Sequence, residues 1–253
     1  MLISPQLGIR PYKRPPAAGA GLVPTGRGNW AELGSPAWAS SSASTRVSDN
    51  FTPSNNSVLC AIFAGIVDTA DPTGTPAIAG GSLSWTKRVE IVSSGLFSTW
   101  LYIIIWTAPV GTGASMAVTF SNLNAAGTFF TGSGHFLDLT GYNTGSPTGA
   151  TASGQNLGND AVNLTLSGSP ASGSYVIGAS AFTTSDSSSR SATPGSGWTE
   201  LYDTGAANNY TALQTQYRTG STSTDVAWSD IADGGDSSFG TCSVAAALEI
   251  KAA

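Results

Sequence analysis

The sequence contains a single histidine, His135, which is therefore its one histidine candidate for a general base. The residue lies in the run SGHFLD over residues 133–138, which contains the three residue types of a Ser-His-Asp site. Such a site also needs an oxyanion hole and a fold that brings the three groups together. No G-x-S-x-G motif occurs, and the run predicts a strand with His135 in its middle. We therefore expect a surface or interface histidine and no hydrolase site.

Paired carboxylates would indicate a second kind of chemistry, the hydrolysis of glycosides. The chain has four glutamates, Glu32, Glu90, Glu200 and Glu249. Glu32 lies in the N-terminal extension, and Glu249 lies near the end of the chain. Glu90 and Glu200 fall at outward positions of predicted strands. The sequence identifies no facing pair, so we expect solvated side chains and no enzyme activity.

The best candidate for a metal site is the run DIADGGD over residues 230–236. Its carboxylates belong to Asp230, Asp233 and Asp236, and Ca²⁺ binds oxygen ligands in flexible loops of this kind. The spacing does not match the EF-hand loop, whose closing glutamate is absent. Aspartate and glycine are also typical of a polar β-turn. We favour the turn and expect no cofactor.

Nucleotide and sugar binding have little support in the sequence. No glycine-rich phosphate loop follows a predicted strand and opens a helix. Seven tryptophans and seven tyrosines could form a sugar-stacking platform. However, Trp100 and Trp106 fall in the most apolar stretch of the chain, where we expect core or interface positions. Trp198 follows a turn, where it could cover one end of a sandwich.

The two cysteines, Cys60 and Cys242, lie far apart in strand-like runs. Two cysteines are too few for a disulfide framework, and no C-x-x-C motif suggests a metal site. We expect two buried free thiols. A single bridge remains the alternative, because the first and last strands of a sandwich often lie side by side.

The stretch that must organise these groups is residues 96–107 (LFSTWLYIIIWT). Aromatic and β-branched side chains predict a strand, and successive side chains of a strand point to opposite faces. One face would carry Trp100, Tyr102, Ile104 and Trp106, and the other Leu101, Ile103 and Ile105. Because neither face is polar, we expect a central strand of a layered β domain, covered on both sides. The second face could alternatively be a self-association surface.

The rest of the chain from residue 46 to residue 253 alternates strand-like runs with turns. Clear examples are residues 58–67, 83–92, 128–140, 175–182 and 242–250. The chain also has 31 glycines, 13 prolines and no sustained helical period. We predict an all-β domain, a β-sandwich or jelly roll of roughly ten antiparallel strands.

Residues 1–45 predict an extended N-terminal arm, because prolines and glycines interrupt any regular ladder. Residues 1–30 hold four basic and no acidic residues, a charge of +4, while the remaining chain carries −9. The acidic body makes nucleic acid an improbable partner. Large apolar residues in the arm indicate packing, either along its own domain or on another subunit. The proposed contact residues are Arg10, Tyr12, Lys13, Arg14, Arg27 and Trp30.

Several short motifs resemble a loosely defined group of phage and bacterial β-sandwich domains. They are FTP (51–53), NSVL (56–59), LY (101–102), AP (108–109), VTF (118–120), LTGY (139–142), PGSGWT (194–199) and AALEIK (246–251). The resemblance covers residues 48–251 and leaves out residues 1–45. It implies a jelly-roll-like sandwich on a phage particle and supplies no catalytic motif.

We therefore expect a non-enzymatic virion structural protein, a capsid decoration or head-surface protein anchored by its arm. Its partners would be the major capsid protein or other virion proteins and further copies of itself, with no nucleic acid and no membrane. The opening residues MLISP lack the features of a signal peptide, so we expect assembly in the host cytoplasm. The alternative is a receptor- or carbohydrate-binding module of a tail fibre, head fibre or spike. A polysaccharide depolymerase would need two facing acids.

Overall fold

The computed structural model describes residues 23–29, 45–68, 71–93, 99–123, 129–156, 162–183, 191–203, 211–232 and 242–253. Every regular element within these residues is a β-strand, seventeen in all. The all-β prediction is thus confirmed, with more and shorter strands than the roughly ten expected. No described residues form a helix that is long and apolar enough to cross a membrane.

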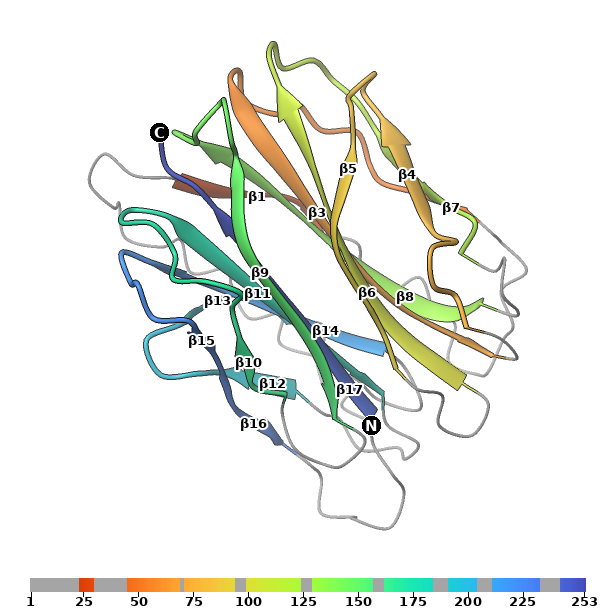
Figure 1. The fold of residues 1–253 in the computed structure, drawn as a ribbon. Helices are drawn as coiled ribbons and strands as arrows, with labels where there is room; N and C mark the ends of the chain where they lie inside the picture. Colours follow the sequence, from red (N-terminus) through yellow and green to blue (C-terminus); the bar gives the residue numbers. More distant parts are fainter. Residues whose placement is uncertain are drawn as a thin grey trace, which may run out of the picture.

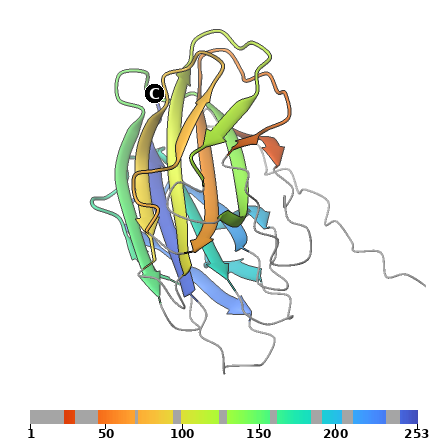
Figure 2. The same ribbon diagram turned by 90° about the vertical axis from the view of Figure 1, so that its right-hand side faces the viewer.

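Two five-stranded antiparallel sheets form the centre of the molecule (Figure 1). The first sheet has the order β1 (Val23–Asn29), β8 (Phe129–Thr140), β3 (Ser57–Asp68), β6 (Thr99–Val110) and β5 (Thr86–Val92). The second has the order β9 (Thr148–Asn156), β17 (Cys242–Ile250), β11 (Tyr175–Thr183), β14 (Thr211–Thr219) and β13 (Thr199–Asp203). They pack face to face as a β-sandwich, and the long strands of both sheets lie along roughly the same axis in Figure 2.

Smaller sheets cover the outer faces of this sandwich. The first sheet is covered by β2 (Arg46–Val47), β7 (Val118–Ser121) and β4 (Ala77–Gly80). The second is covered by two ribbons, β10 (Leu164–Thr165) with β15 (Asp225–Val226) and β12 (Ser191–Pro194) with β16 (Trp228–Ala232). The described chain therefore forms four layers with three apolar cores between them.

Strand alternation explains how one apolar strand can serve two cores. On β6, Leu101, Ile103 and Ile105 lie in the main core between the two large sheets. Tyr102 and Ile104 point the other way, into the core beneath β7. The expectation of a strand covered on both sides is confirmed. Since the chain covers the second face itself, that face needs no second copy of the protein.

The two halves of the chain repeat one strand arrangement. The first sheet reads β1-β8-β3-β6-β5 and the second β9-β17-β11-β14-β13, so each strand has a counterpart in the same place. The ladder from β3 through β6 to β5 also matches that from β11 through β14 to β13 in register. In both, the register of the edge strand shifts after its second residue, between Lys87 and Val89 and between Glu200 and Tyr202. The chain thus contains an internal structural repeat.

The turn that precedes the first long strand is also repeated. Asn56 and Gly173, each one residue before a matching serine, adopt left-handed backbone angles of φ 51° and 81°. Asparagine and glycine are the residues that tolerate this conformation best. A proline lies three residues earlier in each half, at Pro53 and Pro170.

Part of the N-terminal extension belongs to the first sheet. Strand β1 pairs with β8, from Val23 opposite Thr140 to Asn29 opposite His135. The expectation that prolines exclude regular ladders from this region is wrong at β1, because an edge strand tolerates a proline such as Pro24. Of the two alternatives for the arm, residues 23–29 follow the first, packing on their own domain.

The packing of Phe120 on β7 gives a test of whether the outer sheet is integral to the fold. Its ring centroid lies 4.9 Å from that of Phe63 and 5.5 Å from that of Trp106. Phe120→Ala should lower the free energy of unfolding by about 3–5 kcal/mol, since it empties a buried aromatic site. Val47→Ala, at a position 57% exposed on the same outer sheet, should change it by about 0.5 kcal/mol or less. Denaturant unfolding measures both, and similar values would contradict the assignment.

Candidate functional site

His135 lies inside the sandwich, where β8 faces the second sheet. Its side chain is 1% exposed, and a hydrogen bond of 2.8 Å joins its Nδ1 to Oγ1 of Thr215 on β14. The imidazole also stacks on Tyr202 of β13, with ring centroids 5.0 Å apart. The expectation of a surface or interface histidine is therefore wrong. His135 falls on the same side of β8 as Leu137 and Leu139, which belong to the main core.

This environment does not make His135 a catalytic base. Burial lowers the pKa of His135 to about 3, because the interior disfavours the charged imidazolium. Asp138, the third residue type of the SGHFLD run, lies on the opposite face of β8 and accepts a hydrogen bond from the backbone of Ser54. The fold thus separates the histidine from the aspartate.

Asp138 and Glu249 instead perform equivalent structural roles in the two halves. Asp138 Oδ2 accepts from Ser54 N at 2.7 Å, and Glu249 Oε1 accepts from Ala171 N at 2.8 Å. Each amide follows the proline of the repeated turn, and each carboxylate lies near the end of the last strand of its half. Both side chains are at least 97% buried. We call these two contacts the carboxylate clasps.

Glu249 makes the more elaborate clasp. Its Oε2 also accepts from Ala150 N at 2.8 Å, so the carboxylate joins β9 to the repeated turn. Burial alone would raise the pKa of Glu249, but hydrogen bonds from the backbone N–H groups of Ala150 and Ala171 and the charge of Lys251 together lower it. Neither clasp was predicted, although the motifs LDL at 137–139 and LEI at 248–250 each place a carboxylate between two apolar residues of a strand.

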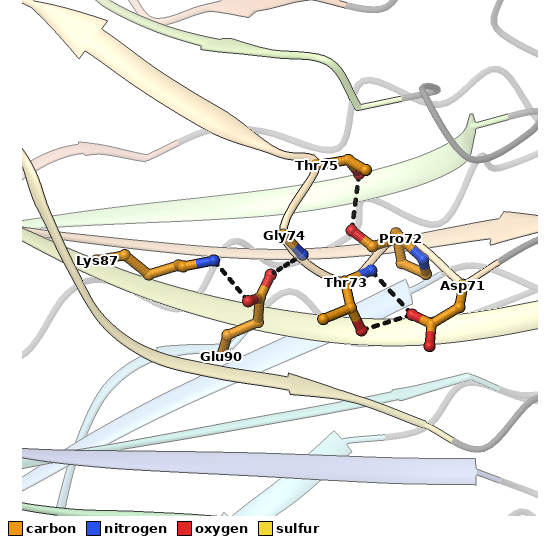
Figure 3. Close-up of polar contacts among 7 residues, drawn as sticks. All are labelled: Asp71, Pro72, Thr73, Gly74, Thr75, Lys87 and Glu90. Atoms are coloured by element: carbon orange, nitrogen blue, oxygen red, sulfur yellow. Dashed lines mark hydrogen bonds and ion pairs between the residues drawn. The ribbon is translucent and has the colours of Figure 1, made fainter.

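Glu90 also makes structural contacts, which Figure 3 shows. Its carboxylate pairs with Lys87 at 2.5 Å and accepts from Gly74 N at 2.9 Å. Asp71 closes the same loop by accepting from the backbone and hydroxyl of Thr73 at 2.8 and 2.6 Å. These bonds fix residues 71–75 against β5. Glu200 is exposed, as the sequence predicts.

Among the described residues, neither the cysteines nor the aspartates of residues 230–236 form a catalytic or metal site. Cys60 is a free, fully buried thiol, so it forms no bridge to Cys242, and burial raises its pKa to about 12. Asp230 lies on β16, where its backbone pairs with Thr193, while Asp233 and Asp236 lie outside the described residues. Where the structure describes side chains, no three histidine, cysteine, aspartate or glutamate residues gather as metal ligands.

The described tryptophans belong to the outer cores of the sandwich. The first-half core contains Trp85, Trp100 and Trp106, and the second-half core contains Trp198 and Trp228. The guanidinium of Arg218 lies 4.5 Å from the ring centroid of Trp198. It therefore covers a face of the indole that would have to be open for a sugar to stack on it.

One small hollow opens beside the outer sheet of the first half. It has a volume of about 250 Å³, and no residue of its lining is ionisable. The lining residues are Pro53, Gly81, Ser82, Leu83, Val110, Thr112, Ala114, Ser115 and Met116. Its lining can therefore make shape-complementary contacts and hydrogen bonds with a bound molecule, but it supplies no general acid or base.

Only one of the proposed arm contacts falls within the described residues. Arg27 lies on β1, at the edge of the first sheet. Arg10, Tyr12, Lys13, Arg14 and Trp30 lie outside the described residues. No protein-family model, curated protein or solved structure matches the chain.

The geometry of the clasps predicts unequal effects of neutralising the two carboxylates. Glu249→Gln should lower the free energy of unfolding by about 1–3 kcal/mol, because one backbone N–H then faces an amide donor instead of an acceptor. Asp138→Asn should have a smaller effect, since its side-chain oxygen can still accept from Ser54. The exposed control Glu200→Gln should stay within about 0.5 kcal/mol of the parent in denaturant unfolding. An equal effect at Glu249 and Glu200 would contradict this account.

The burial of His135 predicts an acid-dependent loss of stability. An unfolded histidine titrates near pH 6.5 and the folded one at about 3, so the unfolded state gains a proton first as pH falls. Stability is complete above pH 6.5 and should decrease by about 1.4 kcal/mol per pH unit as pH falls below it.

Because the chain has no other histidine, the interval from about pH 6.5 to 5 isolates this group from the carboxylates. Denaturant midpoints across that interval should slope in the parent and be flat in His135→Gln. A flat profile in the parent protein would show that His135 is solvated.

Proposed function

We propose that the protein is a non-enzymatic structural protein of a phage virion, a capsid decoration or head-surface protein anchored through its N-terminal arm. The observation that carries the proposal is the pairing of β1 with β8. It places the start of the body at one edge of the first sheet and leaves residues 1–22, with three basic and no acidic residues, ahead of it.

The use of polar groups in the body supports a structural rather than a catalytic role. His135 bonds Thr215 inside the sandwich, Asp138 and Glu249 clasp turns, and Glu90 fixes a loop. Each of these four groups thus stabilises the fold. An enzyme would instead need such groups to converge on a cleft.

Each half of the chain is a jelly roll in this proposal. In the first half β1 pairs with β8, β2 with β7 and β3 with β6. In the second, β9 pairs with β17, β10 with β15 and β11 with β14. Pairing from the ends of the unit inward is what a long antiparallel hairpin gives when it rolls up into two sheets. The resemblance to virion-associated sandwich domains points to the same fold.

The carbohydrate-binding alternative receives no specific support. Stacking of sugars requires aromatic faces that are open to solvent, whereas the five described tryptophans pack on the outer cores. Adhesion to host glycans is thus an outcome to be tested.

The anchoring proposal predicts that charge in the arm controls attachment. The triple variant Arg10→Glu, Lys13→Glu, Arg14→Glu should bind purified particles that lack this protein at least about tenfold more weakly, a loss of 1.4 kcal/mol. Co-sedimentation with particles measures the binding. The matched control Arg10→Lys, Lys13→Arg, Arg14→Lys keeps the charge and should bind like the parent.

A truncation distinguishes the arm from the body. Removing residues 1–22 keeps β1, so the body should retain its melting temperature but lose attachment. Removing residues 1–40 would also uncover the edge of β8 and should lower the melting temperature. Full attachment by the shorter truncation would overturn the proposal.

A further inference from the structure

The outer core of the second half is polar at positions where the first half is apolar. The equivalent pairs, taken from strand register, are Phe63 and Ser180, Ile104 and Gln214, and Trp106 and Gln216. Ser180, Gln214 and Gln216 are completely buried. Burying a polar group without a hydrogen bond destabilises the folded state, so each of these groups needs a partner.

Protein atoms provide partners for Gln216. Its Nε2 donates to the carbonyl oxygen of Ala227 at 2.8 Å, and its Oε1 accepts from the backbone N–H of Gly195 at 3.3 Å. This side chain therefore ties β14 to the chain segments beside β12 and β16. Its polarity is explained by the fold alone.

Gln214 is fixed in orientation but only half satisfied. The indole Nε1 of Trp228 donates to Gln214 Oε1 at 2.6 Å, which settles which end of the amide is oxygen. The Nε2 group, with two hydrogens to donate, is buried and has no hydrogen-bond partner in the protein.

The hydroxyl of Ser180 is the natural counterpart of this amide. Ser180 lies directly opposite Gln214 in the β11–β14 ladder, and side chains so placed have Cβ atoms about 4.5–5.5 Å apart. Its Oγ is also buried and without a protein partner. Two unpaired groups therefore face the same core from neighbouring strands without bonding each other.

We propose that one ordered water molecule binds here and joins Gln214 Nε2 to Ser180 Oγ. A water can accept from the amide and bond the hydroxyl, and buried waters typically serve polar groups of this kind. The buried neighbours in this core are uncharged: apolar side chains, among them Val176, Phe182 and Ala245, and the amide of Gln216. They offer no counter-ion, so the ligand is neutral and small.

The bound water completes a hydrogen-bonded chain across the second half. The chain runs from Trp228 on β16 through Gln214 on β14 to Ser180 on β11. It links the outer ribbon to the large sheet by directed bonds, where Phe63, Phe120 and Trp106 of the first half use aromatic contact.

Crystallography of the full-length protein, at a resolution that defines ordered waters, tests the site. The expected result is a peak of water density about 2.7–3.2 Å from both Gln214 Nε2 and Ser180 Oγ. A direct bond between the two side chains, an empty gap or density larger than water would overturn the proposal.

Water-oxygen magnetic relaxation dispersion gives a second readout in solution. Ser180→Ala and Gln214→Ile, the latter introducing the residue of the first half, should each reduce the number of long-lived waters by one. Ser153→Ala, at an exposed position of β9, should leave the number unchanged. Dispersion amplitudes that are equal in the parent and all three variants would contradict a bound water.

Discussion

The packing of the first large sheet against the second is the interaction on which the rest of the structure depends. The inner faces meet in one apolar core that contains Ile103 and Ile105 from β6, Ala246 and Leu248 from β17, and Ile177 from β11. Because strands alternate, burying one face of such a strand exposes another apolar face on the far side. Each half therefore needs its own outer layer, and four layers follow from one interface.

The internal repeat shows how the same arrangement tolerates different interior chemistry. Both halves share strand order, the register shift in the edge strand, a left-handed residue before the first long strand and a carboxylate clasp. The strand order, the register shift and the left-handed residue are features of the backbone, whereas each clasp also needs a carboxylate side chain to accept the N–H of the turn. The outer cores differ freely, aromatic in the first half and rich in amides in the second, because packing and hydrogen bonding can each fill such a space.

The sequence predicts the long strands well because their apolar content is high. The predicted run 242–250 coincides with β17, and residues 128–140 closely match β8. Strand β9, with the sequence TGATASGQN, was missed because small polar residues give no alternation, and pairing with β17 decides its structure. The clasps were missed for a related reason: the partners of Asp138 and Glu249 are backbone amides 84 and 78 residues away. His135 was predicted at the surface or an interface, although its spacing in the sequence puts it on the same side of the strand as Leu137 and Leu139, which are core residues.

The most direct test of the proposed virion role is the copy number of this chain in purified particles of a phage whose genome carries its gene. Quantitative mass spectrometry against the major shell protein provides that number. A decoration protein should be present at a count comparable to the shell protein. Absence from the particles would contradict a virion role, and a few copies per particle would contradict decoration and favour a fibre or spike.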